Sequence, residues 1–115
     1  MGYSHYKKSH RKLITDQVER TWHECYLSFV RSQKCNGEDT SHFKTRAKQR
    51  GINGTELETL RMRGELYAIE IGSDDPHCQW KPKYILQSMT DCGQVIEGVF
   101  AIDGYNLQGI TCYFL

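Results

Sequence analysis

The side chains in this sequence that are best suited to chemistry are arginines, lysines and threonines in one stretch of the chain. Arginine pairs bidentately with guanine edges or with phosphates, and the threonine methyl group can contact thymine. Basic side chains near a phosphate backbone add affinity without reading the base sequence. The stretch therefore predicts a surface that binds DNA. Its candidate contact residues are Lys44, Arg46, Lys48, Arg50, Thr55, Thr59, Arg61 and Arg63.

The charge is divided unevenly along the chain. Residues 1–63 hold thirteen Lys and Arg against seven Asp and Glu, whereas residues 64–115 hold two against seven, although the net charge is only +1. This asymmetry suggests one surface for an anion and another for a different partner. Nucleic acid is the commonest anionic partner of a basic protein face. A dipolar surface without any partner is the alternative interpretation.

Histidines and cysteines offer a second kind of chemistry. The candidate zinc ligands form two groups, His23, Cys25, Cys35 and His42, and His77, Cys78 and Cys92. Structural zinc sites usually place ligand pairs two to four residues apart on a knuckle, whereas the first group sits on the stripe and at the end of a predicted helix, and the second group is no better placed. A Cys-His pair also lacks a recognisable residue to orient the base, and no glycine motif for binding phosphate occurs. We therefore expect no metal, no cofactor and no enzymatic activity.

The cysteines and the hydropathy indicate in which cellular compartment the protein is expected. Five cysteines at irregular spacing, with no secretory signal at the N-terminus, favour reduced thiols in the cytoplasm. No apolar segment approaches the length of a membrane span, so no membrane partner is expected. The length predicts one domain over residues 13–115, preceded by a flexible basic arm at residues 1–12.

A helix-turn-helix would present the basic residues. Its first helix is expected to begin after Asp39-Thr40-Ser41 and to end at Gly51, which would supply the turn. Its second helix is expected from Thr55 to Arg63, where Thr55 and Glu58 have the spacing of a capping box. In this arrangement the threonines and arginines of the second helix face outward toward a groove.

Three further elements complete the predicted fold. Apolar residues at every fourth position from Ile14 to Val30, including Val18 and Trp22, predict a helix over Leu13–Gln33 whose stripe faces the core. Leu66–Ile71 and His77–Lys81 predict a β-hairpin wing, and Tyr84–Met89 predicts a short helix. The expected fold class is mostly α (α+β), with a three-helix helix-turn-helix core, a β-hairpin wing and a short helical tail.

The order of features over Phe43–Leu115 resembles a known family. Arg46-Ala47-Lys48-Gln49-Arg50-Gly51-Ile52 leads into Leu57-Glu58-Thr59-Leu60-Arg61-Met62-Arg63-Gly64, followed by Gln79-Trp80 and Gly93-Gln94-Val95-Ile96-Glu97-Gly98-Val99. This order is similar to that of small bacterial DNA-binding proteins related to the Xre/MbcA/ParS antitoxins. The resemblance implies a recognition helix, a hairpin and a short helical tail.

Together these features predict a small DNA-binding regulator, a transcriptional repressor or an antitoxin-like protein. The acidic C-terminal half is expected to bind a protein partner or a second copy, and the apolar segment Ile110–Leu115 is the expected dimer contact. The alternative is a protein-binding adaptor or inhibitor from a mobile element, which would use the same fold to block or bridge another protein.

Overall fold

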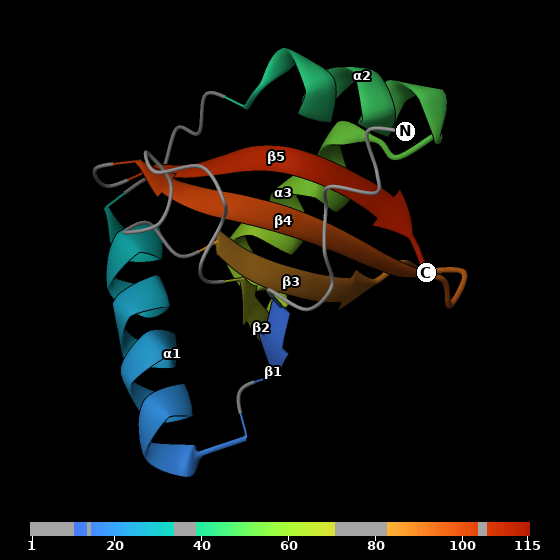
Figure 1. The fold of residues 1–115 in the computed structure, drawn as a ribbon. Coiled ribbons are helices and arrows are strands. Elements are labelled where there is room, and N and C mark those ends of the chain that lie inside the picture. The colour runs from blue at the N-terminus through green and yellow to red at the C-terminus, as the bar shows by residue number, and fades with distance from the viewer. Residues whose placement is uncertain (1–10, 14, 34–38, 71–82, 104–105) are drawn as a thin grey trace.

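A computed structural model of the chain describes residues 11–13, 15–33, 39–70, 83–103 and 106–115 (Figure 1). The elements in chain order are β1 (Arg11–Leu13), α1 (Gln17–Ser32), α2 (Ser41–Gln49), α3 (Gly54–Arg63), β2 (Glu65–Glu70), β3 (Lys83–Met89), β4 (Val95–Asp103) and β5 (Asn106–Phe114). Their strands form a 5-stranded antiparallel sheet in the order β1-β2-β3-β4-β5. None of the helices in these ranges is long and apolar enough to cross a membrane.

The expected fold class is wrong, because the sheet is the centre of the structure and not a small wing. The helices lie around that sheet, with α3 behind β3 and β4, α2 beside β5, and α1 at one end (Figure 1). The predicted helical tail is instead the hairpin of β4 and β5, which are nine residues each. The segment Ile110–Leu115 therefore belongs mostly to a strand within the sheet.

The predicted short helix over Tyr84–Met89 is also wrong, since these residues lie in β3. Tyr84, Ile85 and Leu86 are all fully buried, so both faces of this strand are covered. The strand pairs with β2 on one side and with β4 on the other. A short apolar run buried on both faces cannot be distinguished from a buried helix by periodicity. The strand predicted over His77–Lys81 lies outside the described residues.

The main core lies between the helices and one face of the sheet. Its fully buried members include Phe43 of α2, Leu60 of α3 and Phe100 of β4. The rings of Phe43 and Phe100 meet edge to face with their centroids 5.6 Å apart. Gly98 brings β4 close to α3, because a Cβ there would lie 2.7 Å from Leu60 Cδ2. The helices are thus held on the sheet by interlocking side chains.

The opposite face of the sheet carries a smaller apolar cluster and a buried carboxylate. Ala68, Ile85 and Val99 are fully buried there, with Ile110 packed against them. Glu97 is 1% exposed and accepts hydrogen bonds from Gln87 Nε2, at 2.9 Å, and from the Tyr113 hydroxyl. These bonds join three neighbouring strands of the sheet, β3, β4 and β5.

The predicted inward stripe of α1 is only partly correct. Val30 is buried as expected, but Val18 is 78% and Trp22 60% exposed. The side of α1 that meets the sheet is instead formed by Leu27, Val30 and His23, whose Nδ1 lies 2.8 Å from Tyr84 Oη. The core therefore covers the side of α1 that carries Leu27 and Val30, and it leaves the side that carries Val18 and Trp22 exposed.

Residues 11–13 are placed in a strand, although the sequence predicts a flexible basic arm over residues 1–12. Arg11 pairs with Glu70 and Lys12 with Ile69 in an antiparallel register. β1 therefore forms one edge of the sheet, and α1 begins only four residues after it, behind the N-cap Asp16. Residues 1–10 of the predicted arm lie outside the described ranges.

Candidate nucleic-acid interface

Helix α2 begins at Ser41, one residue earlier than the sequence predicts, and is fastened to the edge of β5. Thr40 caps the helix, with its Oγ1 accepting from the Phe43 N–H at 3.1 Å. The Thr40 N–H donates to the Gly109 carbonyl at 3.0 Å, and its hydroxyl lies 3.2 Å from the Gly109 and Ile110 carbonyls. Thr40 thus caps the helix and also donates hydrogen bonds to carbonyl groups of β5. β5 is an edge strand of the sheet, which would otherwise be open to pairing with another strand.

The docking of α2 buries one side and turns a cationic side outward. Phe43 and Ala47 face the core, while Lys44 and Lys48 are exposed one turn apart. Arg46 and Arg50 are half-buried and one turn apart, but they lie on the other flank of the buried side, because residues two positions apart on a helix do not face each other. The helix contains no acidic residue, and among the described residues no ion pair involves Lys44 or Lys48. The exposed cationic side of α2 is therefore formed by Lys44 and Lys48.

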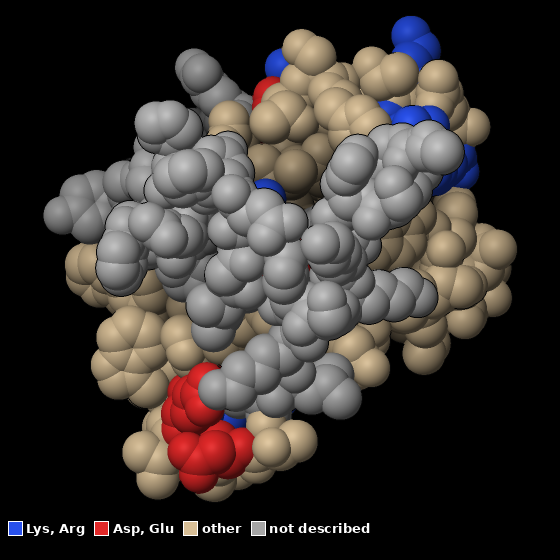
Figure 2. Space-filling view, viewed as in Figure 1, with Lys and Arg blue, Asp and Glu red and all other residues tan. Residues whose placement is uncertain are grey.

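The charged side chains of the described residues are also divided over the face shown in Figure 2. Basic side chains gather over α2, and acidic side chains gather at the opposite end, over the beginning of α1 (Figure 2). Because the net charge is only +1, the basic surface of α2 is a local concentration and not a property of the whole molecule. A local concentration of one sign can steer an oppositely charged partner to that face.

Arg50 has a structural contact that the sequence did not indicate. Its Nη1 donates to the Cys112 carbonyl at 2.6 Å, and its Cζ lies 6.0 Å from the centre of the Tyr113 ring. Together with Thr40 at the other end of α2, Arg50 closes the edge of β5. We therefore assign it to the attachment of α2.

The turn between α2 and α3 has the predicted glycine. Gly51 has φ of +71°, a conformation that favours glycine, and Ile52 after it is buried. The predicted capping box at Thr55 and Glu58 is wrong, because the observed box lies two residues earlier in the chain. Asn53 Oδ1 accepts from the Glu56 N–H at 2.8 Å, and Glu56 Oε1 accepts from the Asn53 N–H at 3.0 Å. The box therefore begins α3 at Gly54.

Arg61 does not face outward, so the prediction that it contacts base edges is wrong. It is 5% exposed and forms two hydrogen bonds to the Asp39 carboxylate, Nη1–Oδ1 at 2.8 Å and Nη2–Oδ2 at 2.6 Å. Nη1 also donates to the Leu107 carbonyl at 2.6 Å, and Asp39 Oδ1 accepts from the Gly109 N–H at 2.8 Å. This ion pair joins α3, the start of α2 and β5.

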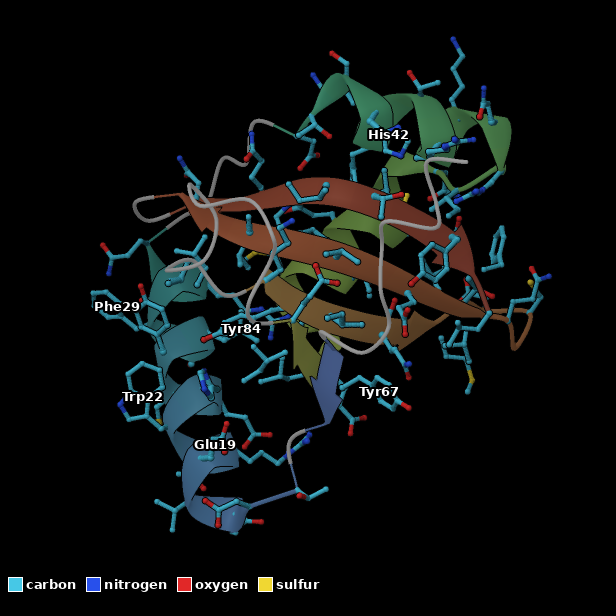
Figure 3. All side chains as sticks on the ribbon, viewed as in Figure 1. Glu19, Trp22, Phe29, His42, Tyr67 and Tyr84 are labelled. Atoms are coloured by element: carbon cyan, nitrogen blue, oxygen red, sulfur yellow. The ribbon has the colours of Figure 1, made fainter. Side chains whose placement is uncertain are left out.

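The remaining predicted contacts on α3 are exposed but lie among mixed charges. Thr55, Thr59 and Arg63 face solvent, and Thr59 Oγ1 donates back to the Thr55 carbonyl at 2.9 Å. Glu58 is exposed on the same helix and lies 3.6 Å from Arg61 Nε. With Arg61 directed inward, the outer side of α3 is much less basic than that of α2. His42, which the sequence indicated only as a zinc ligand, is exposed in the first turn of α2 (Figure 3).

The described cysteines and histidines lie on different parts of the fold. His23 meets Tyr84, Cys25 is exposed on α1, and His42 is on α2. Among the described residues no three His, Cys, Asp or Glu side chains converge as metal ligands would. The other ligands considered in the sequence, Cys35, His77 and Cys78, lie outside the described ranges, in residues 34–38 and 71–82.

The thiols provide a direct test of this packing. Burial raises the pKa of the Cys112 thiol to about 11, whereas Cys25 and Cys92 are exposed. Only the thiolate reacts with disulfide reagents. At pH 8 we expect Cys92 to be labelled in the native protein and Cys112 only after unfolding, with the sites read by peptide mass spectrometry. Labelling of native Cys112 as fast as of Cys92 would contradict the placement of β5 beneath α2.

Comparison with known proteins assigns this chain to no family. No protein-family model, curated protein or solved structure matches this chain. The resemblance to the proteins related to Xre/MbcA/ParS antitoxins therefore stays a prediction.

Proposed function

We propose that this protein is a small DNA-binding regulator that contacts the phosphate backbone through the exposed side of α2. The observation that carries the proposal is the like-charged pair Lys44 and Lys48, both exposed on a nine-residue helix without an acid. Like charges four residues apart destabilise a helix by about 0.2–0.5 kcal/mol per pair. A bound polyanion would attract both charges and so offset that repulsion.

The attachment of α2 supports the same proposal. Contacts at both ends of the helix, through Thr40 and Arg50, hold it against β5. The exposed lysines therefore project from a rigid support, and little backbone ordering is needed when they bind. The proposal includes a cytoplasmic location, in keeping with the expected reduced thiols.

Phosphate contact accounts for this surface better than base reading does. Base reading from α3 would need arginines facing a groove, and Arg61 is instead paired with Asp39. The exposed lysines of α2 supply point charges, which recognise phosphate but not sequence. We therefore expect similar affinity for duplexes of different sequence, with Thr55, Thr59 and Arg63 adding at most a modest preference.

The test is a fluorescence-anisotropy titration of duplex DNA at several salt concentrations. The logarithm of the binding constant should fall with the logarithm of salt concentration by about 0.9 for each phosphate contacted. Lys44→Gln and Lys48→Gln should each reduce that slope by about 0.9 and weaken binding to all sequences alike. Arg20→Gln, on α1 beside Glu24 and Glu65, removes the same charge far from α2 and is the matched control.

Two results would count against the proposal. One is a wild-type salt slope close to zero, and the other is an equal loss in the Arg20→Gln control and the two lysine variants. Either would favour the alternative function, a protein-binding adaptor or inhibitor, in which α2 has no nucleic-acid role.

A further inference from the structure

The exposed side of α1 carries a row of apolar residues that the core does not use. Val18 is 78% exposed, Trp22 60% and Phe29 49%, and Cys25 between them is also exposed. Trp22 and Phe29 both point away from the sheet, on the side of α1 opposite Tyr84 (Figure 3). We call these four residues, Val18, Trp22, Cys25 and Phe29, the α1 seam.

The spacing of the α1 seam is that of a helix which pairs with another helix. Its members are separated by four, three and four positions, the alternation found at the a and d positions of a coiled coil. Leu27, which faces the core, lies on the opposite side of the helix. The helix is therefore apolar on two sides, and only one of them is explained by the sheet.

The sizes of the seam residues select the orientation of the partner. In an antiparallel pair of two copies, with the two-fold axis midway between Trp22 and Cys25, Trp22 of each copy meets Cys25 of the other. The same axis sets Phe29 against Val18. Each large ring then meets a small side chain. A parallel pair would instead set Trp22 against Trp22 and Phe29 against Phe29, which would separate the helices there and leave gaps at Val18 and Cys25.

The charged residues beside the α1 seam also permit a second copy of the protein to pack against it. Thr21 and Ser28 flank it on one side, and Glu19 and Tyr26 on the other, so each helix brings one formal charge to the contact. The other charged residues of α1, Arg20, Glu24 and Arg31, lie on a different side of the helix. Arg31 is held there by hydrogen bonds to the Arg61 and Gly64 carbonyls, both at 2.8 Å. With the axis midway between Trp22 and Cys25, the two Glu19 side chains lie at opposite ends of the contact, so these like charges do not face each other.

We propose that the α1 seam is a self-association surface on which α1 of a second copy packs antiparallel. This inference does not depend on DNA binding, because α1 and α2 lie at different ends of the molecule (Figure 1). It replaces the expected dimer contact at Ile110–Leu115. That expectation rested on the core covering Val18 and Trp22, which are exposed.

The experiment is sedimentation velocity of the full chain at tens of micromolar, where we expect a dimer. Val18→Glu alone and Phe29→Lys alone should each weaken association about tenfold or more, since each places a charge against an apolar side chain. The double variant Val18→Glu/Phe29→Lys should recover most of the affinity, because in the antiparallel pair each new glutamate meets a new lysine. In a parallel pair the double variant would combine two repulsions.

Tyr67→Ala is the matched control, since Tyr67 is 43% exposed on β2, outside the seam, and its loss should leave the dimer intact. Circular dichroism of each variant should show unchanged helix content, as expected for exposed positions. A wild-type protein that sediments as a monomer would overturn the proposal. A dimer that persists in both single variants, or a double variant no better than the singles, would do the same.

Discussion

Arg61→Met should lower the free energy of unfolding by about 3–5 kcal/mol, because it leaves the Asp39 carboxylate buried without its charge partner. The Asp39 side chain is 12% exposed and receives two hydrogen bonds from the guanidinium. The loss also removes the donor to the Leu107 carbonyl and the guanidinium over the Phe100 ring, with Cζ 5.5 Å from its centre. Urea unfolding followed by circular dichroism measures the effect.

The matched control is Arg63→Met, two positions along the same helix. Arg63 is exposed, so its replacement should change stability by no more than about 0.5 kcal/mol. The double variant Arg61→Met/Asp39→Leu should be more stable than Arg61→Met alone, since no buried charge then remains. Equal stability of Arg61→Met and Arg63→Met would contradict the buried pair and return Arg61 to its predicted place on the outer surface.

Gly109→Ala should destabilise the protein by about 1–3 kcal/mol, the usual cost of overpacking a core. A Cβ at Gly109 would lie 2.7 Å from Phe43 Cδ1 and 2.8 Å from Asp39 Oδ1. Neither neighbour can move freely, since Phe43 is fully buried and Asp39 is held by Arg61. The substitution therefore pushes α2 away from β5 at the point where Thr40 attaches it. Urea unfolding of the full chain measures the loss.

Gly54→Ala is the control for that experiment. A Cβ at Gly54, the first residue of α3, meets nothing within 4 Å, so the variant should match or slightly exceed the wild type in stability. If Gly109→Ala were as stable as Gly54→Ala, the close approach of α2 to β5 would be wrong. A lowered affinity of Gly109→Ala for DNA at unchanged net charge would further support a role for the position of α2 in binding.

The cap of α2 and the turn between α2 and α3 could be predicted from the sequence because their signals are local. Thr40 caps α2 through the N–H of Phe43, three residues along, and Gly51 turns the chain without reference to any distant group. Lys44 and Lys48 share a surface for the same reason, since helical spacing alone places them one turn apart. Local hydrogen bonds and helical periodicity thus account for this part of the candidate site.

Long-range contacts determined the sheet, the side of α1 that is buried and the role of Arg61. Tyr84–Met89 forms a strand because β2 and β4 lie on both sides of it, and its apolar run is compatible with a strand or a buried helix. Trp22 is exposed because the sheet meets α1 through Leu27 and Val30. Arg61 turns inward because Asp39, 22 residues earlier in the chain, lies there. Partners that distant leave no periodic signal in the sequence, since folding alone brings them together.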